Sequence, residues 1–230
     1  MPELLNILFE DNHIIAVNKN SHDLVQKDAT GDLSLDNKIR QFLKEKYAKP
    51  GDVFLGVVHR LDRPVTGVVL FARTSKALSR LTALFREGKI SKTYWAVVKN
   101  KPPKESDRLV HHLVRNAKQN KSYCNEVAKA GSKEAALSYK TIGKSDNYFL
   151  LEVDLETGRH HQIRAQLAHI GCPIKGDLKY GFPRSNPDGG ISLHARKIRF
   201  IHPVTKKEVV ITAEVPEGDI WNAFDLNPNP

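Results

Sequence analysis

The sequence predicts an α+β fold whose sheet is mixed or mostly antiparallel. Several short apolar runs, rich in β-branched residues, have the length and composition of buried strands. A few longer segments repeat apolar residues at helical spacing. Because the two kinds of segment do not alternate regularly, the pattern argues against repeated βαβ units and a parallel sheet.

Three helices are expected, and each has recognisable ends. The first covers 34–47 after Ser34, a typical cap, and is followed by Pro-Gly. The second begins at Ser75, the expected cap, and ends at Gly88. The third covers 158–170. Expected strands cover 14–17, 53–58, 65–72, 93–98, 137–142, 149–155, 191–200 and 208–215.

One domain spanning 1–230 is the expected organisation, because the chain shows no internal repeat and no low-complexity block. Residues 99–134 are polar and basic with little periodicity. This segment is predicted to be either a basic insertion or a mobile loop.

The composition excludes several classes of protein. The chain has 230 residues, of which 40% are hydrophobic and 27% charged, so it is long and apolar enough to fold around a core. Two cysteines exclude a disulfide scaffold. There is no apolar run of the ~18 residues that a membrane span needs, and the N-terminus lacks the basic region of a signal peptide. We therefore expect a cytoplasmic protein, with monomer as the default state and no membrane partner.

Positive charge is concentrated in one quarter of the chain. The formal net charge is +10, and residues 86–144 hold 14 Lys and Arg against 5 Asp and Glu. A field of this kind attracts a polyanion such as nucleic acid, although a solvated basic surface would have the same composition.

A short polar segment, HRLDR at 59–63, lies between two apolar runs. A charged turn that leaves a buried strand is a common place for catalytic groups. Asp62 lies between Arg60 and Arg63, and a nearby guanidinium keeps a carboxylate ionised and able to act as base or nucleophile. The alternative is a structural Arg–Asp cluster that holds the turn.

A second polar segment, TGRHHQIR at 157–164, lies at the start of the third expected helix. Backbone N–H groups at a helix start, together with Arg159, His160 and His161, would hold an anion. Arg164 points to another face and can meet an internal carboxylate. His160, His161 and His169 suggest a metal, but no further ligand completes a set at the usual spacing, so no metal is expected.

A third segment, KTYWA at 92–96, places Tyr94 and Trp95 on opposite faces of a strand. One of these rings can face a groove and stack on a base, although the pattern itself favours core packing of both. Gly67, which follows Thr66 at a strand start, can relieve crowding there.

Together these segments resemble the RluA-type pseudouridine synthase family from about residue 7 to 216. The stretch HRLDRPVTGVVLFAR at 59–73 resembles the family signature around its catalytic aspartate. KTYWA, TGRHHQIRAQL at 157–167, IKGD at 174–177 with Tyr180 and Gly181, LHA at 193–195 and HP at 202–203 follow in the family's order. The chain departs from the family at His160, where Thr is usual, and at Asn20, where an Asn-Lys-Pro motif usually has its Pro.

The resemblance implies a catalytic domain without an N-terminal RNA-binding module, with a central mixed, mostly antiparallel sheet, flanking helices and a central cleft. It implies an isomerase that converts uridine in ribosomal or transfer RNA to pseudouridine, by base flipping and without a cofactor. Asp62 matches the essential aspartate, Arg164 the arginine that pairs with it, and Tyr94 the tyrosine that stacks on the target base. Arg60 matches the arginine that enters the gap left by the flipped base. The residues expected to bind RNA are Arg60, His59, Arg63, Arg159, His160 and Lys92.

Two other functions fit parts of the sequence. A catalytically inactive RNA-binding or ribosome-assembly module could have the same fold, but such a module has no need of a held carboxylate. A phosphodiesterase or glycosidase could use Asp62 with Asp154 or Asp177, but hydrolysis usually calls for a recognisable carboxylate pair or a metal.

Overall fold

In the computed structural model, which describes residues 5–27 and 31–224, the chain divides into two compact units. Unit 1 holds residues 1–91 and 195–214, and unit 2 holds 92–194 and 215–230. Residues 1–4, part of the segment on which the signal-peptide prediction rests, lie outside the described ranges. Among the described residues, no helix is long and apolar enough to span a bilayer.

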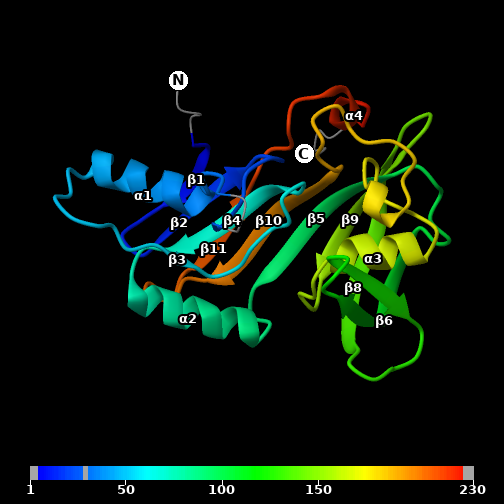
Figure 1. The fold of residues 1–230 in the computed structure, drawn as a ribbon, viewed down its shortest axis with the longest axis horizontal. Coiled ribbons are helices and arrows are strands. Elements are labelled where there is room, and N and C mark those ends of the chain that lie inside the picture. Colours follow the sequence, from blue (N-terminus) through cyan, green and yellow to red (C-terminus); the bar gives the residue numbers. More distant parts are fainter. Residues whose placement is uncertain (1–4, 28–30, 225–230) are drawn as a thin grey trace. The chain divides into compact units, whose positions relative to one another are not determined.

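Unit 1 consists of a sheet with helices α1 and α2, which flank the strands in Figure 1. Its antiparallel pairs are β1 with β2, β2 with β4, β3 with β4, and β10 with β11. The elements are β1 (Ile7–Glu10), β2 (Ile14–Lys19), α1 (Leu35–Lys46), β3 (Gly56–Val57), β4 (Thr66–Ala72), α2 (Ser75–Arg86), β10 (Leu193–Ile201) and β11 (Glu208–Thr212). The first two residues of β10 belong to unit 2.

Strand β4 lies in the middle of this sheet, and all of its residues are buried. Val68 and Leu70 pack in one cluster with Ala77 and Leu81 of α2. Because strand side chains alternate, Val69 points to the opposite face of the sheet. A strand covered on both faces has to be apolar throughout, which explains the continuous apolar run in the sequence.

Unit 2 is an antiparallel sheet in the order β5-β9-β8-β6-β7, with α3 and two short helices. Its elements are β5 (Ser91–Val98), β6 (Ser106–Asn116), β7 (Lys121–Asn125), β8 (Lys133–Lys144), β9 (Phe149–Leu155), α3 (Gln162–His169), the 3-10 helix η1 (Leu178–Tyr180) and α4 (Asp219–Asn222). One apolar cluster joins Val97 and Leu150 to Trp221 and Phe224 near the end of the chain.

Most of the predicted elements are present, and the fold class is α+β as predicted. The second helix is capped by Thr74, whose hydroxyl accepts a hydrogen bond from the Ala77 N–H, so the prediction of Ser75 as cap is wrong. The expected strand 53–58 is reduced to Gly56–Val57. The third helix begins at Gln162 rather than at 158. Residues 99–134, predicted as a basic insertion or a mobile loop, contain β6 and β7.

Candidate functional site

In unit 1, the predicted aspartate lies in the loop between β3 and β4. Its neighbour His59 is half-buried, and its Nε2 accepts a hydrogen bond from the Leu70 N–H at 2.9 Å. The His59 ring also stacks on Phe85 of α2, with 4.8 Å between ring centroids. His59 therefore fastens the start of the loop to β4 and α2.

A buried ammonium group holds the other end of the same loop. Lys19, at the end of β2, is only 1% exposed. Its Nζ donates to the carbonyl oxygens of Asn20, Arg63 and Val65 at 2.7, 2.8 and 2.8 Å. Burial lowers the pKa of Lys19 to about 7, while the negative charges of Asp23 and Asp62 oppose that shift. Lys19 is therefore close enough to Asp62 for their charges to interact.

Asp62 itself is half-buried, and its carbonyl accepts a hydrogen bond from the Val65 N–H at 3.0 Å. Its sequence neighbours Arg60 and Arg63 are exposed. The Arg63 guanidinium pairs with Asp32 at 2.9 Å, and both side chains are about half exposed. The loop thus combines a fixed backbone with cations at the surface.

Gly67 accounts for a close approach at the start of β4. Its φ is +112°, and a Cβ at this position would lie 2.3 Å from the carbonyl oxygen of Ala195 in β10. The prediction that Gly67 relieves crowding at a strand start is confirmed.

In unit 2, the KTYWA segment forms β5. Tyr94 is buried and pairs with Val153 of β9, whereas Trp95 packs against the cluster that contains Trp221. Burial lowers the pKa of Lys92. The Lys92 Nζ lies 3.4 Å from the place where a Cβ at residue 158 would be, so Gly158 leaves room for it.

The loop before α3 is held by the Gln162 side chain. Its Oε1 accepts hydrogen bonds from the Arg159 N–H at 2.9 Å and the Thr157 hydroxyl at 2.7 Å, and its Nε2 donates to the carbonyl of Ala136. The exposed Arg159 side chain donates through Nε to the carbonyl of Glu134. These hydrogen bonds hold residues 157–161 in a loop conformation, which explains why the helix starts later than predicted.

Arg164 makes a buried, bidentate ion pair with Asp177. Arg164 Nε lies 2.7 Å from Oδ2, and Nη2 lies 2.9 Å from Oδ1. The side chains are 6% and 1% exposed. The internal carboxylate expected for Arg164 is therefore present within unit 2. Its expected partner Asp62 belongs to unit 1, and that pairing stays a prediction.

Three further side chains surround this ion pair. Tyr180 lies under the Arg164 guanidinium, with 5.2 Å from its ring centroid to Cζ. His161 contacts both Tyr180 and Arg164. Ser122 of β7 contacts Tyr180 and also His160, whose Nε2 lies 3.1 Å from the Asn120 amide oxygen. A polar network thus joins β7, the loop before α3, and η1.

Within each unit, the structure brings most of the predicted site residues together. His59, Arg60, Asp62 and Arg63 share the β3–β4 loop of unit 1. In unit 2, Lys92 meets the loop that carries Arg159 and His160. Sequence reasoning gave no role to Lys19 and Ser122. It considered His161 only as part of an anion site or as a metal ligand, and Asp177 and Tyr180 only as a hydrolytic carboxylate or motif members.

One group of potential metal ligands lies within the part of the chain that the structure describes: His111, Glu126 and His169. Gln166 Nε2 lies 3.1 and 3.3 Å from two backbone carbonyls and 3.0 Å from His111 Nδ1. Because carbonyl oxygens can only accept, the Gln166 amide group must place its NH₂ toward them and toward His111 Nδ1. His111 Nδ1 therefore accepts a hydrogen bond from Gln166, and the ring proton of His111 lies on Nε2, toward Glu126. A metal at Nε2 would need that proton on Nδ1. The group therefore fits a hydrogen-bonded cluster better than a metal site.

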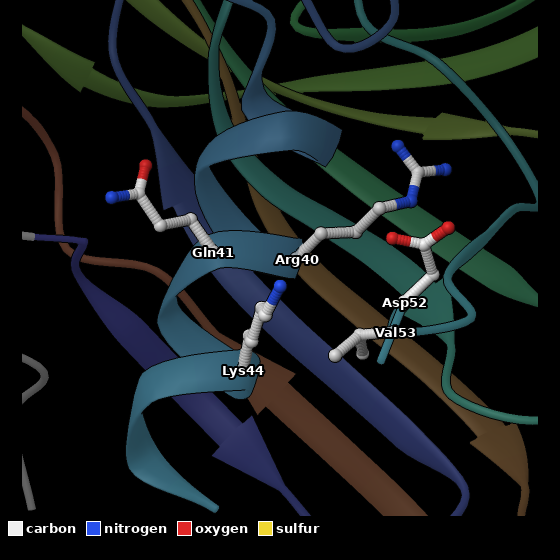
Figure 2. A pocket seen from close by; sticks show the side chains of 5 residues that line it. All are labelled: Arg40, Gln41, Lys44, Asp52 and Val53. Carbon is white, nitrogen blue, oxygen red and sulfur yellow. The ribbon is translucent and has the colours of Figure 1, made fainter. Parts of the chain in front are cut away.

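A separate pocket borders α1 in unit 1, and Figure 2 shows the side chains that line it. None of the predicted site residues is among them. They are Arg40, Gln41, Lys44, Asp52 and Val53.

Comparisons with known proteins identify relatives over nearly the whole chain. A family model described as RNA pseudouridylate synthase matches residues 13–169. The tRNA pseudouridine synthase C of Vibrio parahaemolyticus is 31% identical over 238 residues, with 96% of this chain and 93% of the relative covered. The ribosomal large subunit pseudouridine synthase D of Zymomonas mobilis is 31% identical, with 93% of this chain and 70% of the relative covered.

Two solved structures share the fold. The human RNA pseudouridylate synthase domain containing 4 matches with a TM-score of 0.78 at 22% identity, covering 92% of this chain and 88% of that chain. The human RNA pseudouridylate synthase domain containing 1 matches with a TM-score of 0.74 at 21% identity, covering 96% of this chain and 88% of that chain. At these identities the similarity establishes the architecture.

Proposed function

Because the chain belongs to the RNA pseudouridylate synthase family, we propose that Asp62 is the essential carboxylate with which it isomerises uridine in RNA. In this reaction the C1′–N1 bond breaks, the base turns, and a C1′–C5 bond forms. The C5 hydrogen leaves as a proton to water and N1 takes up a proton, so atoms and electrons balance without a redox partner. Tyr94 stacks on the target base, and Arg164 pairs with Asp62 and keeps it ionised.

The observation that carries this proposal is the way in which the Asp62 loop is held. Burying an ammonium group is costly, yet Lys19 is buried, and two of its three hydrogen bonds go to carbonyls of this loop, those of Arg63 and Val65. His59 holds the same loop from its other end. A surface turn needs no such support, whereas a catalytic carboxylate has to be held in place.

The exposed cationic side chains have a role in flipping the target base out of its stack. A uridine in a structured RNA must leave its stack at a cost of a few kcal/mol. Arg60 enters the gap, and one stacking ring offsets about 1–3 kcal/mol of that cost. His59, Arg63, Arg159, His160 and Lys92 complete the proposed RNA-binding set. His59, Lys92 and His160 are only partly exposed, so their part is to position the loops that contact RNA.

Relatives named for transfer RNA and for the large ribosomal subunit match almost equally well. We therefore propose these two RNA classes as candidate substrates. The basic segment 86–144, which includes β6 and β7, holds the phosphates around the target. The protein acts as a cytoplasmic monomer. The reaction takes place in a central cleft, which the resemblance implies.

Tritium release tests this proposal directly. Transfer and ribosomal RNA are transcribed with uridine tritiated at C5, incubated with the protein, and tritium in water is counted. Wild type and Asp52→Asn, a control at an exposed carboxylate, are expected to release tritium, and Asp62→Asn is expected to release none. Release by Asp62→Asn at the wild-type rate would refute the role of Asp62. Salt-sensitive binding without release by wild type would instead indicate an RNA-binding module.

A further inference from the structure

His161 has an unusual backbone conformation immediately before α3. It is the N-cap residue, with φ 52° and ψ 26°, in the left-handed region that residues with a Cβ seldom adopt. Its side chain makes no capping hydrogen bond. Strained positions of this kind cluster at functional sites, so the contacts of the ring need an explanation.

The ring is buried and contacts Arg164 on one side. His161 Nε2 lies 3.1 Å from Arg164 Nη1. A guanidinium can only donate hydrogen bonds, so Nε2 must be the acceptor and carries no proton.

The other nitrogen contacts a hydroxyl group whose own hydrogen is used elsewhere. Tyr180 Oη accepts a hydrogen bond from the Ser122 N–H at 2.8 Å and donates to the Ser122 carbonyl at 3.1 Å. His161 Nδ1 lies 3.1 Å from the same oxygen and therefore donates to it. Both contacts of the ring are satisfied only by the neutral tautomer with its proton on Nδ1.

We propose that His161 is a positioning residue that, as a neutral imidazole with its proton on Nδ1, orients the Arg164 guanidinium. Asp177 holds Nε and Nη2 of that guanidinium, and His161 holds Nη1. The two contacts together fix the plane of the group. The consequence for catalysis rests on the role of Arg164 proposed above.

This arrangement makes the reaction sensitive to acid. Protonation of His161 would put an N–H against an Arg164 N–H and add a second positive charge beside it. The charged or titratable groups that face His161 are Arg164, Tyr180 and the stacked His160, whose ring centroid is 3.8 Å away, with Asp177 beyond the guanidinium. The Arg164 guanidinium lies between His161 and the Asp177 carboxylate, so a proton on His161 would meet the positive charge at closer range than the negative one.

The first test compares two substitutions in the tritium-release assay. His161→Gln can keep an acceptor near Nε2, whereas His161→Leu cannot. Loss of one hydrogen bond to a charged group predicts a fall in kcat of about 10- to 100-fold for His161→Leu, with KM within about twofold, and substantial recovery in His161→Gln. His169→Gln, the same change at the other end of α3, serves as control and keeps kcat.

The pH profile separates positioning from a merely structural role. The ratio of wild-type kcat to that of His161→Gln is expected to fall as pH decreases from 8 to 5.5, because only wild type can acquire the disruptive proton. A ratio that is constant with pH would overturn the proposal, and so would a His161→Leu variant that keeps its kcat or changes only KM.

A spectroscopic test does not depend on activity. Correlation spectra of ¹⁵N-labelled imidazoles distinguish the two neutral tautomers, and the signal missing from His161→Gln identifies His161. The expected result at pH 7.5 is a proton on Nδ1, with Tyr180→Phe weakening that preference. A proton on Nε2 would overturn the inference. If wild type releases no tritium, the proposed function fails, and this spectrum still decides the tautomer.

Discussion

The buried ammonium group of Lys19 predicts how the stability of the fold depends on pH. Burial lowers its pKa from 10.5 to about 7, so between these values the unfolded chain binds one proton more than the folded chain. Stability from this group is therefore fully present above the unfolded pKa and is lost as the pH falls through 7. At 1.36 kcal/mol per pKa unit, the full effect is at most about 5 kcal/mol, of which about 2 kcal/mol develops between pH 7 and 9.

Lys19→Met removes the titrating group and keeps much of its volume. It also leaves the carbonyls of Asn20, Arg63 and Val65 without their donor, at a cost of about 1–3 kcal/mol each. The uncharged amine keeps two N–H donors, and the third hydrogen bond is part of the balance that sets the pKa, so only the protonation of Lys19 makes the difference depend on pH. The difference in unfolding free energy between wild type and variant is therefore expected to increase by about 2 kcal/mol from pH 7 to 9.

Urea unfolding followed by circular dichroism at pH 6.5, 7, 8 and 9 measures this difference. Lys44→Met, at an exposed lysine of α1, is the matched control, and its difference from wild type should not change with pH. If the Lys19→Met difference is equally flat, the three carbonyls keep the ammonium charged throughout this range, and the inference from burial is refuted.

Three other substitutions or treatments have definite expected outcomes. Gly67→Ala should lower the unfolding free energy by about 3 kcal/mol or more, because the new Cβ meets the backbone of Ala195, and urea unfolding measures it. Asp177→Asn should cost about 3 kcal/mol in the same measurement and should abolish tritium release, because it breaks the buried bidentate ion pair that orients the Arg164 guanidinium; wild-type release would contradict this. Burial raises the pKa of Cys124 to about 12, so iodoacetamide at pH 8 should label it far more slowly than in urea, as mass spectrometry can show.

The elements that could be predicted are those whose side chains follow one clear period. Strand β4 is apolar throughout, and α1 and α2 bury residues at helical spacing. Strand β6 also alternates, since Leu109, His111 and Leu113 are buried in turn. A histidine at the middle core position hides that alternation from sequence reasoning. The buried His111 is accommodated by Gln166, which no local pattern indicates.

For the candidate site, the motifs located the residues but not their partners. The resemblance supplied the expected roles of Asp62, Tyr94 and Arg164. The contacts that hold them join residues far apart in the chain, such as Lys19 with the carbonyl of Val65, 46 residues away. Such contacts depend on how strands pair, and the polar residue types involved are equally common on surfaces. Sequence reasoning therefore could not distinguish a buried ammonium from a solvated one.

The discontinuity of unit 1 bears on how the protein forms during synthesis. Its core cluster contains Ile14 and Val68 but also Ile198 and Ile211. The first 91 residues therefore cannot complete their core until residue 213 has left the ribosome, whereas β5 to β9 are contiguous and can pair earlier. The nascent chain must keep the apolar β2 and β4 from aggregating during that interval. Chaperones that bind exposed apolar strands are thus expected to act on the part of the chain made first.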